Sequence, residues 1–135
     1  MKKEAVLHIP LSHYAYAEDE QTLVIRIRTA KNYIEKCSLF YGDRVDMQEP
    51  IHTKEIGMIK VSSDDLFDYF EGYVKDIYTR VCYYFRLEDK IETLYYYSRG
   101  FCDKISCHRT EYFQFPYIRR EDIQIDYLCP VLGWK

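Results

Sequence analysis

Apolar and polar side chains alternate along several short stretches of the chain. This period of two is typical of strands that turn one face to a core and the other to solvent. The stretch TLVIRIRTA shows it clearly, with one face made by Leu23, Ile25 and Ile27 and the other by Val24, Arg26 and Arg28. The stretch KCSLFYGD repeats the pattern and ends at the turn signal Gly42–Asp43, with Cys37, Leu39 and Tyr41 opposed to Lys36, Ser38 and Phe40.

The tyrosine-rich stretch RVCYYFRLEDKIETLYYYS predicts a β-hairpin. Glu88 to Lys90 form its turn, and the chain returns over residues 91–97. In the first strand, one face is made by Val81, Tyr83, Phe85 and Leu87 and the other by Cys82, Tyr84 and Arg86. In the returning strand, Tyr96 faces opposite to Tyr95 and Tyr97. A last short strand is predicted at EYFQFPYI, where Pro116 ends it.

The stretch SSDDLFDYFEGYVKDIY fits two structures. Ser62 with Asp65 resembles a helix capping box, and Leu66, Phe70 and Tyr73 follow helical spacing. However, Phe67, Tyr69 and Tyr73 would also share one face of a strand. Periodicity alone leaves this segment open between helix and strand.

Composition favours an all-β fold. The chain has 135 residues, the size of one domain, and 17% of them are aromatic. Aromatic side chains favour strands, and short strands separated by turns suggest a sandwich. We therefore expect most tyrosine rings to pack the core and the sheets, and a minority to remain available for stacking on a sugar.

Charge and cysteine content limit the classes of partner and ligand that we expect. The net charge is -3 and no basic run is present, so we expect no nucleic-acid partner. No stretch has the length of a membrane helix, and the N-terminus lacks the apolar stretch of a secretory signal. Five scattered cysteines fit a reducing cytoplasm. The stretch CDKISCH (Cys102, Cys107, His108) lacks a second ligand pair for zinc, so we expect neither metal nor cofactor.

No catalytic constellation is visible. His8, His13 and His52 have no nucleophile or carboxylate at a motif spacing, and the glycines form no phosphate-binding loop. A glycosidase needs two carboxylates facing each other across a cleft, about 5–10 Å apart. A compact sandwich offers few such clefts, so we expect the chain by itself not to be an enzyme.

Five stretches in order together resemble a known family: HYAYAEDEQTLVIRIRTAKN, CSLFYGDRVDM, LFDYFEGYV, RVCYYFRLED and EYFQFPYI. They are similar to the N-terminal domain of neopullulanase, cyclomaltodextrinase and maltogenic amylase, which are glycoside hydrolases of family 13. This domain is classed as carbohydrate-binding module family 34. The resemblance implies an immunoglobulin-like antiparallel β-sandwich over residues 1–120 and a strand at LFDYFEGYV. It makes residues 121–135 a tail or linker remnant.

In that family a (β/α)₈ barrel with the catalytic carboxylates follows, and such a barrel takes about 250 residues. This chain cannot contain one, so the resemblance implies no catalytic residue here. It does imply a role for the loop YGDRVDM, which lies against the partner's cleft in family dimers. Val45 stands where relatives often carry an aromatic ring.

The resemblance thus predicts a non-catalytic cytoplasmic domain that serves dimerisation and cleft shaping, with weak α-glucan contact. The alternative is a free-standing sugar-binding or protein-interaction module. The candidate site combines the loop with rings expected to point outward: Tyr41, Asp43, Arg44, Val45 and Met47, with Tyr84 and Tyr96.

Overall fold

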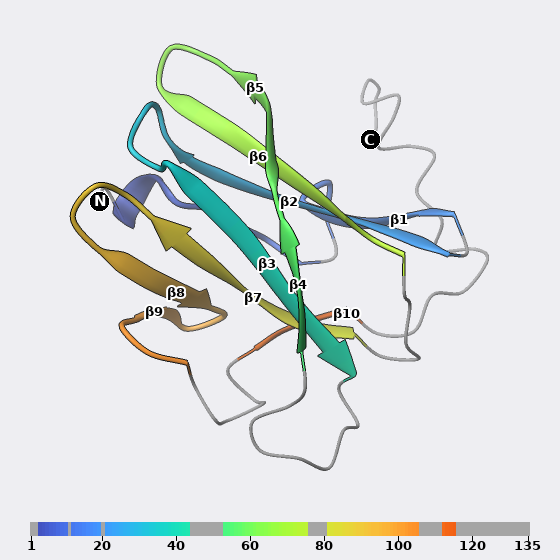
Figure 1. The fold of residues 1–135 in the computed structure, drawn as a ribbon. Coiled ribbons are helices and arrows are strands. Elements are labelled where there is room, and N and C mark those ends of the chain that lie inside the picture. The colour runs from blue at the N-terminus through green and yellow to red at the C-terminus, as the bar shows by residue number, and fades with distance from the viewer. Residues whose placement is uncertain are drawn as a thin grey trace.

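Two antiparallel β-sheets pack face to face in the computed structural model of the chain (Figure 1). The structure describes residues 3–10, 12–19, 21–43, 53–75, 81–105 and 112–115. A four-stranded sheet has the order β1-β2-β6-β5, formed by Ala15–Asp19, Thr22–Ala30, Phe67–Val74 and Ile59–Ser63. The other sheet has the order β4-β3-β7-β8-β9, with β10 paired to β7. Its strands are Thr53–Gly57, Lys36–Asp43, Val81–Glu88, Thr93–Tyr97, Gly100–Cys102 and Phe113–Phe115. A short 3₁₀ turn, η1, spans Lys3–Ala5.

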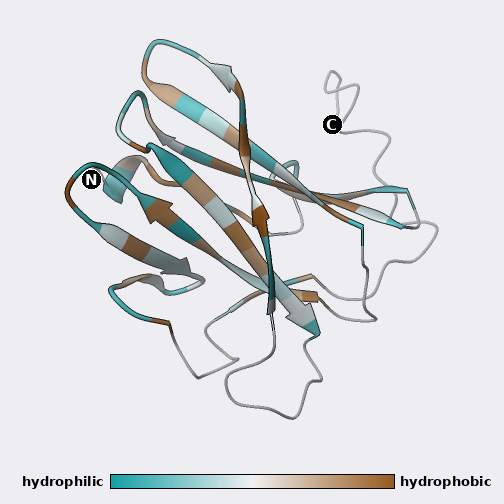
Figure 2. Cartoon of the chain, in the orientation of Figure 1, coloured by the Kyte–Doolittle hydropathy of each residue, from teal (hydrophilic) through white to brown (hydrophobic). Residues whose placement is uncertain are grey.

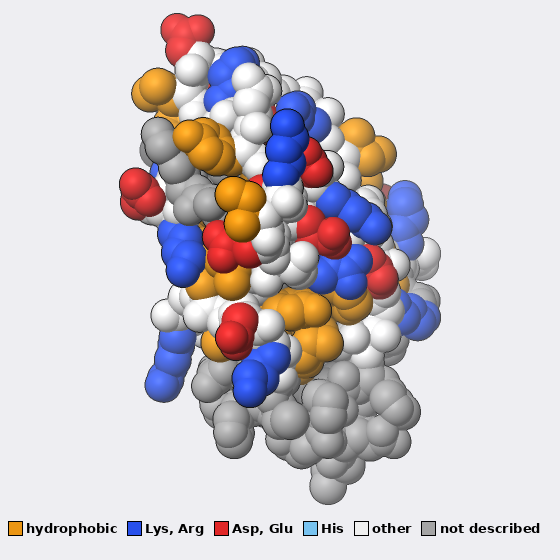
Figure 3. Space-filling view, turned by 60° about the vertical axis from the view of Figure 1, so that its left-hand side comes forward, with side chains coloured by type: hydrophobic (Ala, Val, Ile, Leu, Met, Phe, Trp, Pro, Cys, Tyr) orange, Lys and Arg blue, Asp and Glu red, His pale blue; other side chains and the backbone are white. Residues whose placement is uncertain are grey.

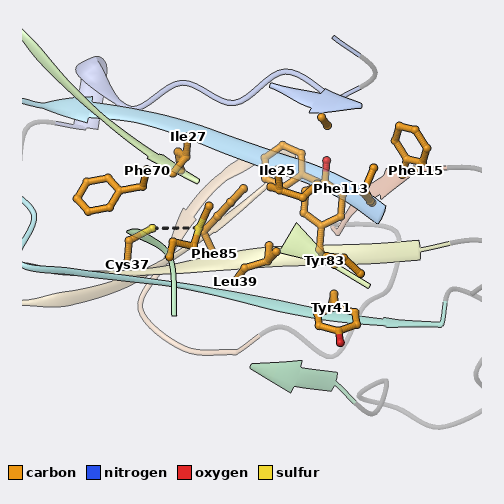
Figure 4. Close-up of a cluster of buried hydrophobic side chains, with 14 of the residues drawn as sticks. Ile25, Ile27, Cys37, Leu39, Tyr41, Phe70, Tyr83, Phe85, Phe113 and Phe115 are labelled. Atoms are coloured by element: carbon orange, nitrogen blue, oxygen red, sulfur yellow. Dashed lines mark hydrogen bonds between the residues drawn. The ribbon is translucent and has the colours of Figure 1, made fainter. Parts of the chain in front are cut away.

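The predicted all-β immunoglobulin-like sandwich is confirmed, and the alternation of apolar residues explains it. Hydrophobic and hydrophilic positions alternate along the strands in Figure 2. The side chains between the sheets form one cluster, part of which Figure 4 shows. Ile25, Ile27 and Phe70 come from the four-stranded sheet, and Leu39 and Phe85 come from the other. Burial of this apolar area is the main force that holds the two sheets together.

The segment that periodicity left open between helix and strand is strand β6, as the family resemblance implied. Its register against β2 places Ile27 opposite Phe70 and Arg26 opposite Glu71. The capping box does not start a helix. Instead, Asp64 accepts hydrogen bonds from the backbone N–H groups of Leu66 at 2.9 Å and Phe67 at 2.8 Å, which forms the turn before β6.

Strand β7 is buried on both of its faces. Tyr83 and Phe85 point into the main core, as the sequence predicted. On the opposite face of the sheet, a second cluster consists of Cys82, Tyr84, Tyr97 and Tyr112, with Phe40, Tyr95 and Cys102 packed against it. The crowding of tyrosines in residues 80–101 therefore supplies two cores, one on each side of a single sheet.

A buried histidine ties the N-terminal segment to the main core. The Nδ1 atom of His8 lies 2.6 Å from the Arg26 carbonyl oxygen, and Nε2 lies 2.7 Å from the Tyr83 hydroxyl. Because a carbonyl only accepts, Nδ1–H donates to it, and neutral Nε2 accepts the hydroxyl proton of Tyr83. Burial lowers the pKa of His8 from 6.5 to about 4, although the bond to the Arg26 carbonyl opposes this shift.

We expect this histidine to set the stability of the domain in mild acid. The unfolded chain protonates His8 near pH 6.5 and the folded chain only near pH 4, so stability falls as the pH drops between these values. The loss should reach about 3 kcal/mol at pH 4. Urea unfolding at a series of pH values measures it.

Two variants separate His8 from the other groups that titrate. His8→Gln should remove most of the slope between pH 6.5 and 4, whereas His13→Gln, at an exposed ring that solvent screens, should remove only a minor part of it. Carboxylates such as Asp64, whose pKa is lowered by the Leu66 and Phe67 N–H groups, lose their contribution as the pH falls through 3.8, so they affect the slope mainly at its acid end. An unchanged slope in His8→Gln would contradict this assignment.

Candidate functional site

The predicted loop site is described only in part. Tyr41 and Asp43 form the end of β3, while Arg44, Val45 and Met47 lie outside the described residues. The prediction that Tyr41 is an outward ring is wrong, since its side chain is 5% exposed and belongs to the main core cluster. It lies at the edge of the group drawn in Figure 4. The strand pairs Tyr41 with Tyr83, and alternation along β3 directs both rings to the inner face.

Tyr84 faces away from the main core, as predicted, but it is not available as a platform. Its ring is 2% exposed, because other aromatic rings cover it. Phe40 stacks on it at 5.1 Å between centroids and 3° between planes, and Tyr97 stacks at 4.9 Å. The outer face of this sheet is therefore a second packed layer at this position.

The prediction that Tyr96 is an outward ring is also wrong. It is half-buried and packs against the main core, with Phe101 at 4.8 Å and Phe113 at 5.4 Å between centroids. Burial raises the pKa of its hydroxyl, while a hydrogen bond with the His8 backbone lowers it. Tyr96 thus supports the attachment of the N-terminal segment rather than facing a ligand in the described structure.

A groove that the sequence did not predict lies on the outer face of the four-stranded sheet. It has a volume of about 400 Å³, in the range of small-molecule sites. Residues from each strand or its immediate flank line it: His13, Tyr14, Arg26, Val61, Ser62, Tyr69 and Glu71.

An ion pair between Arg26 and Glu71 forms part of the lining of this groove. The two residues are opposite each other on β2 and β6, and the Arg26 Nε atom donates to Glu71. Arg26 also donates to the Tyr16 hydroxyl at 3.2 Å, and Tyr73 donates to Glu71. Glu71 is 6% exposed, so the carboxylate is held by its partners rather than by water.

The electrostatics of the groove are balanced. Hydrogen bonding to Glu71 and burial raise the pKa of Tyr73 to about 12, so this hydroxyl keeps its proton at neutral pH. Burial, with the nearby Arg26 charge, lowers the pKa of His13, which favours its neutral form. Arg26 and Glu71 then supply one positive and one negative charge that compensate each other.

Sequence alternation could place Arg26 and Glu71 on outer faces but could not bring them together. Tyr69, Glu71 and Tyr73 recur at every second residue, which is a signal for one face of a strand. The missing information was the pairing of β2 with β6 and its register, which are fixed by the buried faces.

Among the described residues, no group of three or more His, Cys, Asp or Glu could hold a metal ion, and none of the helices has the length and hydrophobicity of a membrane span. Cys37, Cys82 and Cys102 are free thiols, while Cys107 and His108 of the predicted metal-like stretch lie outside the described residues. On the face drawn in Figure 3, basic and acidic side chains are interspersed among hydrophobic ones.

The fold defines the class of this protein as an immunoglobulin-like sandwich domain. Residues 1–119 match the family described as alpha amylase, N-terminal ig-like domain, and the chain belongs to this family.

The relatives are glucan-acting enzymes by name. The chain is 36% identical over 125 residues to a cyclomaltodextrinase of Geobacillus thermopakistaniensis (strain MAS1), covering 91% of the chain. It is 35% identical over 125 residues to a maltogenic alpha-amylase of Bacillus acidopullulyticus, again covering 91% of the chain. A solved cyclomaltodextrinase superposes with a TM-score of 0.81 and 31% identity, over 89% of this chain and 20% of that one. The chain spans 21% of the length of either sequence relative.

We expect Tyr84 to be a stability residue. Tyr84→Ala should lower the free energy of unfolding by about 3 kcal/mol, because it empties the centre of the second cluster. Tyr33→Ala, at a ring 44% exposed, should change it by less than about 0.5 kcal/mol. Chemical denaturation of both variants tests this, and a Tyr84→Ala domain as stable as the parent would show that the cluster is only loosely packed.

Proposed function

We propose that this chain serves as the non-catalytic N-terminal domain of a glycoside hydrolase that degrades maltodextrin, cyclodextrin or pullulan. Its tasks are dimerisation and shaping of the substrate cleft, with weak contact to α-glucan. The observation that carries the proposal is the match of residues 1–119 to the α-amylase N-terminal domain family, in a chain 36% identical to a cyclomaltodextrinase.

The geometry supports an accessory role. The main core fills the space between the sheets, and among the described residues that line the groove on the four-stranded sheet Glu71 is the single carboxylate. Strand β3 leads directly into residues 44–52, so Asp43 stands at the start of the segment that carries Arg44, Val45 and Met47. We assign this segment to the wall of a partner's cleft.

A cytoplasmic location is part of the proposal. One relative, 29% identical over 126 residues, is named an intracellular maltogenic amylase of Bacillus subtilis (strain 168). Burial raises the pKa of the Cys37 thiol, which keeps this cysteine protonated and unreactive.

We expect the 135-residue chain to release no reducing sugar from cyclodextrin, pullulan or starch. The physical reason is that hydrolysis requires an acid and a nucleophile held on opposite sides of the glycosidic bond. A reducing-sugar assay against a buffer blank measures this. Activity that stayed with the chain through repurification would overturn the accessory role.

The assembly role is tested in a chimera. The 125 residues of the Geobacillus cyclomaltodextrinase that match this chain are replaced by it, and a second protein lacks them altogether. The chimera should keep the oligomeric state of the parent and its ratio of activity on cyclomaltodextrin to activity on starch, whereas the shortened protein should lose the first and change the second. Light scattering and kcat/KM on the two substrates are the measurements. A shortened protein that matched its parent in both would favour a free-standing module.

A further inference from the structure

We propose that the groove on the four-stranded sheet is a binding site for a glucosyl unit of an α-glucan, separate from the loop after β3. This inference deepens the proposed function and rests on it for the class of sugar. The groove is lined by residues of β2, β5 and β6 and by the approach to β1, whereas the loop follows a strand of the other sheet. A ligand in the groove therefore contacts none of the residues that were predicted from sequence.

Aromatic rings supply the apolar walls of the groove. The half-buried Tyr69 lines the groove, and Tyr14, from the segment before β1, adds a smaller contact because only 7% of it is exposed. Val61, 49% exposed on β5, adds an aliphatic contact beside Tyr69. A pyranose ring has apolar faces made of C–H groups and a polar edge of hydroxyls, which suits a site with aromatic walls and a few convergent polar groups.

The ion pair supplies those polar groups. The guanidinium of Arg26 has more N–H donors than its contacts with Glu71, Tyr16 and the His13 carbonyl use, and 32% of this side chain is exposed. The Glu71 carboxylate has acceptor sites beyond its two partners, but only 7% of its side chain is exposed, so Arg26 supplies most of the polar surface that a ligand can reach. A donor fork and an acceptor side by side match neighbouring hydroxyls, each of which can both accept and donate.

Charge balance selects a neutral ligand. The positive charge of Arg26 and the negative charge of Glu71 are in direct contact, so neither an anion nor a cation finds an uncompensated partner. A phosphate group would approach the Glu71 carboxylate, and an amine would approach the Arg26 guanidinium. A neutral polyhydroxylated ring meets neither repulsion.

The site is held rigid before a ligand arrives. Arg26 and Glu71 stand on paired strands, and Tyr16 and Tyr73 bind their outer atoms. Tyr69 is fixed by its hydroxyl, which donates to Asp64 at 3.2 Å. Side chains ordered in advance lose little entropy on binding, which helps a small groove to bind a sugar at all.

The test is an NMR titration of the ¹⁵N-labelled 135-residue chain with maltotriose, with a dissociation constant expected near ~1 mM. Amide shifts should centre on residues 13–14, 26, 61–62 and 69–71. Tyr69→Ala should weaken binding about tenfold by removing a wall, while Tyr69→Phe, which keeps the ring and loses only the bond to Asp64, should stay within about twofold. The charge argument is tested with maltotriose oxidised to its acid at the reducing end, which should bind no more tightly than neutral maltotriose.

Two more variants distinguish loss of the groove from loss of the folded domain. Val61→Trp changes a half-exposed side chain and should fill the groove, abolishing the shifts while the spectrum stays dispersed. Tyr33→Ala, in a different hollow lined by Asn32 and Ile91, should leave binding unchanged.

The outcomes are distinguishable from failure of the proposed function. Shifts confined to residues 41–52 would overturn the groove while supporting glucan contact through the loop. No shifts at ~10 mM maltotriose would overturn the groove and leave the assembly role to the chimera. Tighter binding of the acid than of the neutral sugar would overturn the choice of a neutral ligand.

Discussion

Strand β7 must be covered on both faces, and the architecture follows from that requirement. It pairs with β3 on one side and with β8 and β10 on the other, so it occupies the interior of its sheet. Residues 81–85 are all buried. One face lies against the opposite sheet, and the other needs rings from neighbouring strands, because an exposed apolar strand would be solvated poorly. This requirement accounts for the abundance of tyrosine better than a ligand platform does. A tyrosine covers as much apolar area as a phenylalanine and still offers a hydroxyl at the wet rim.

Burying tyrosine in a core creates a polar group that needs a partner, and His8 meets this need for Tyr83. The same imidazole binds the Arg26 carbonyl on β2, so one side chain links the N-terminal segment to both sheets. The outer side of the Arg26 residue belongs to the groove. Arg26 thus connects the core to the groove. Its backbone carbonyl accepts the hydrogen bond from His8, and its guanidinium forms the ion pair with Glu71.

Alternation along the chain was enough to separate the two faces of β2, β3 and β7, because most inward positions are apolar, and the outward direction expected for Tyr41 went against this alternation. It could not show what covers an outward face. Tyr84 was placed on the correct side of β7, but its burial depends on Phe40 and Tyr97 from separate strands. The groove depends in the same way on pairing: Arg26 and Glu71 are far apart in sequence, and only the register of β2 with β6 brings them together. Residues 67–74 could be assigned to a strand only through the family resemblance, since the spacing of their apolar residues fits both a helix and a strand.

The chain crosses from one sheet to the other within a very short stretch, because β4 ends at Gly57 and β5 begins at Ile59. Met58, between them, donates its backbone N–H to the Cys37 carbonyl on β3 and places its side chain against Gly72 on β6, where a Cβ would come within 3.3 Å of the Met58 side chain. The Met58 side chain therefore connects the two sheets along one border, where the absence of a side chain at Gly72 gives it room. Sliding of one sheet past the other would have to extract this methionine. Along this border the two sheets should therefore move together rather than independently.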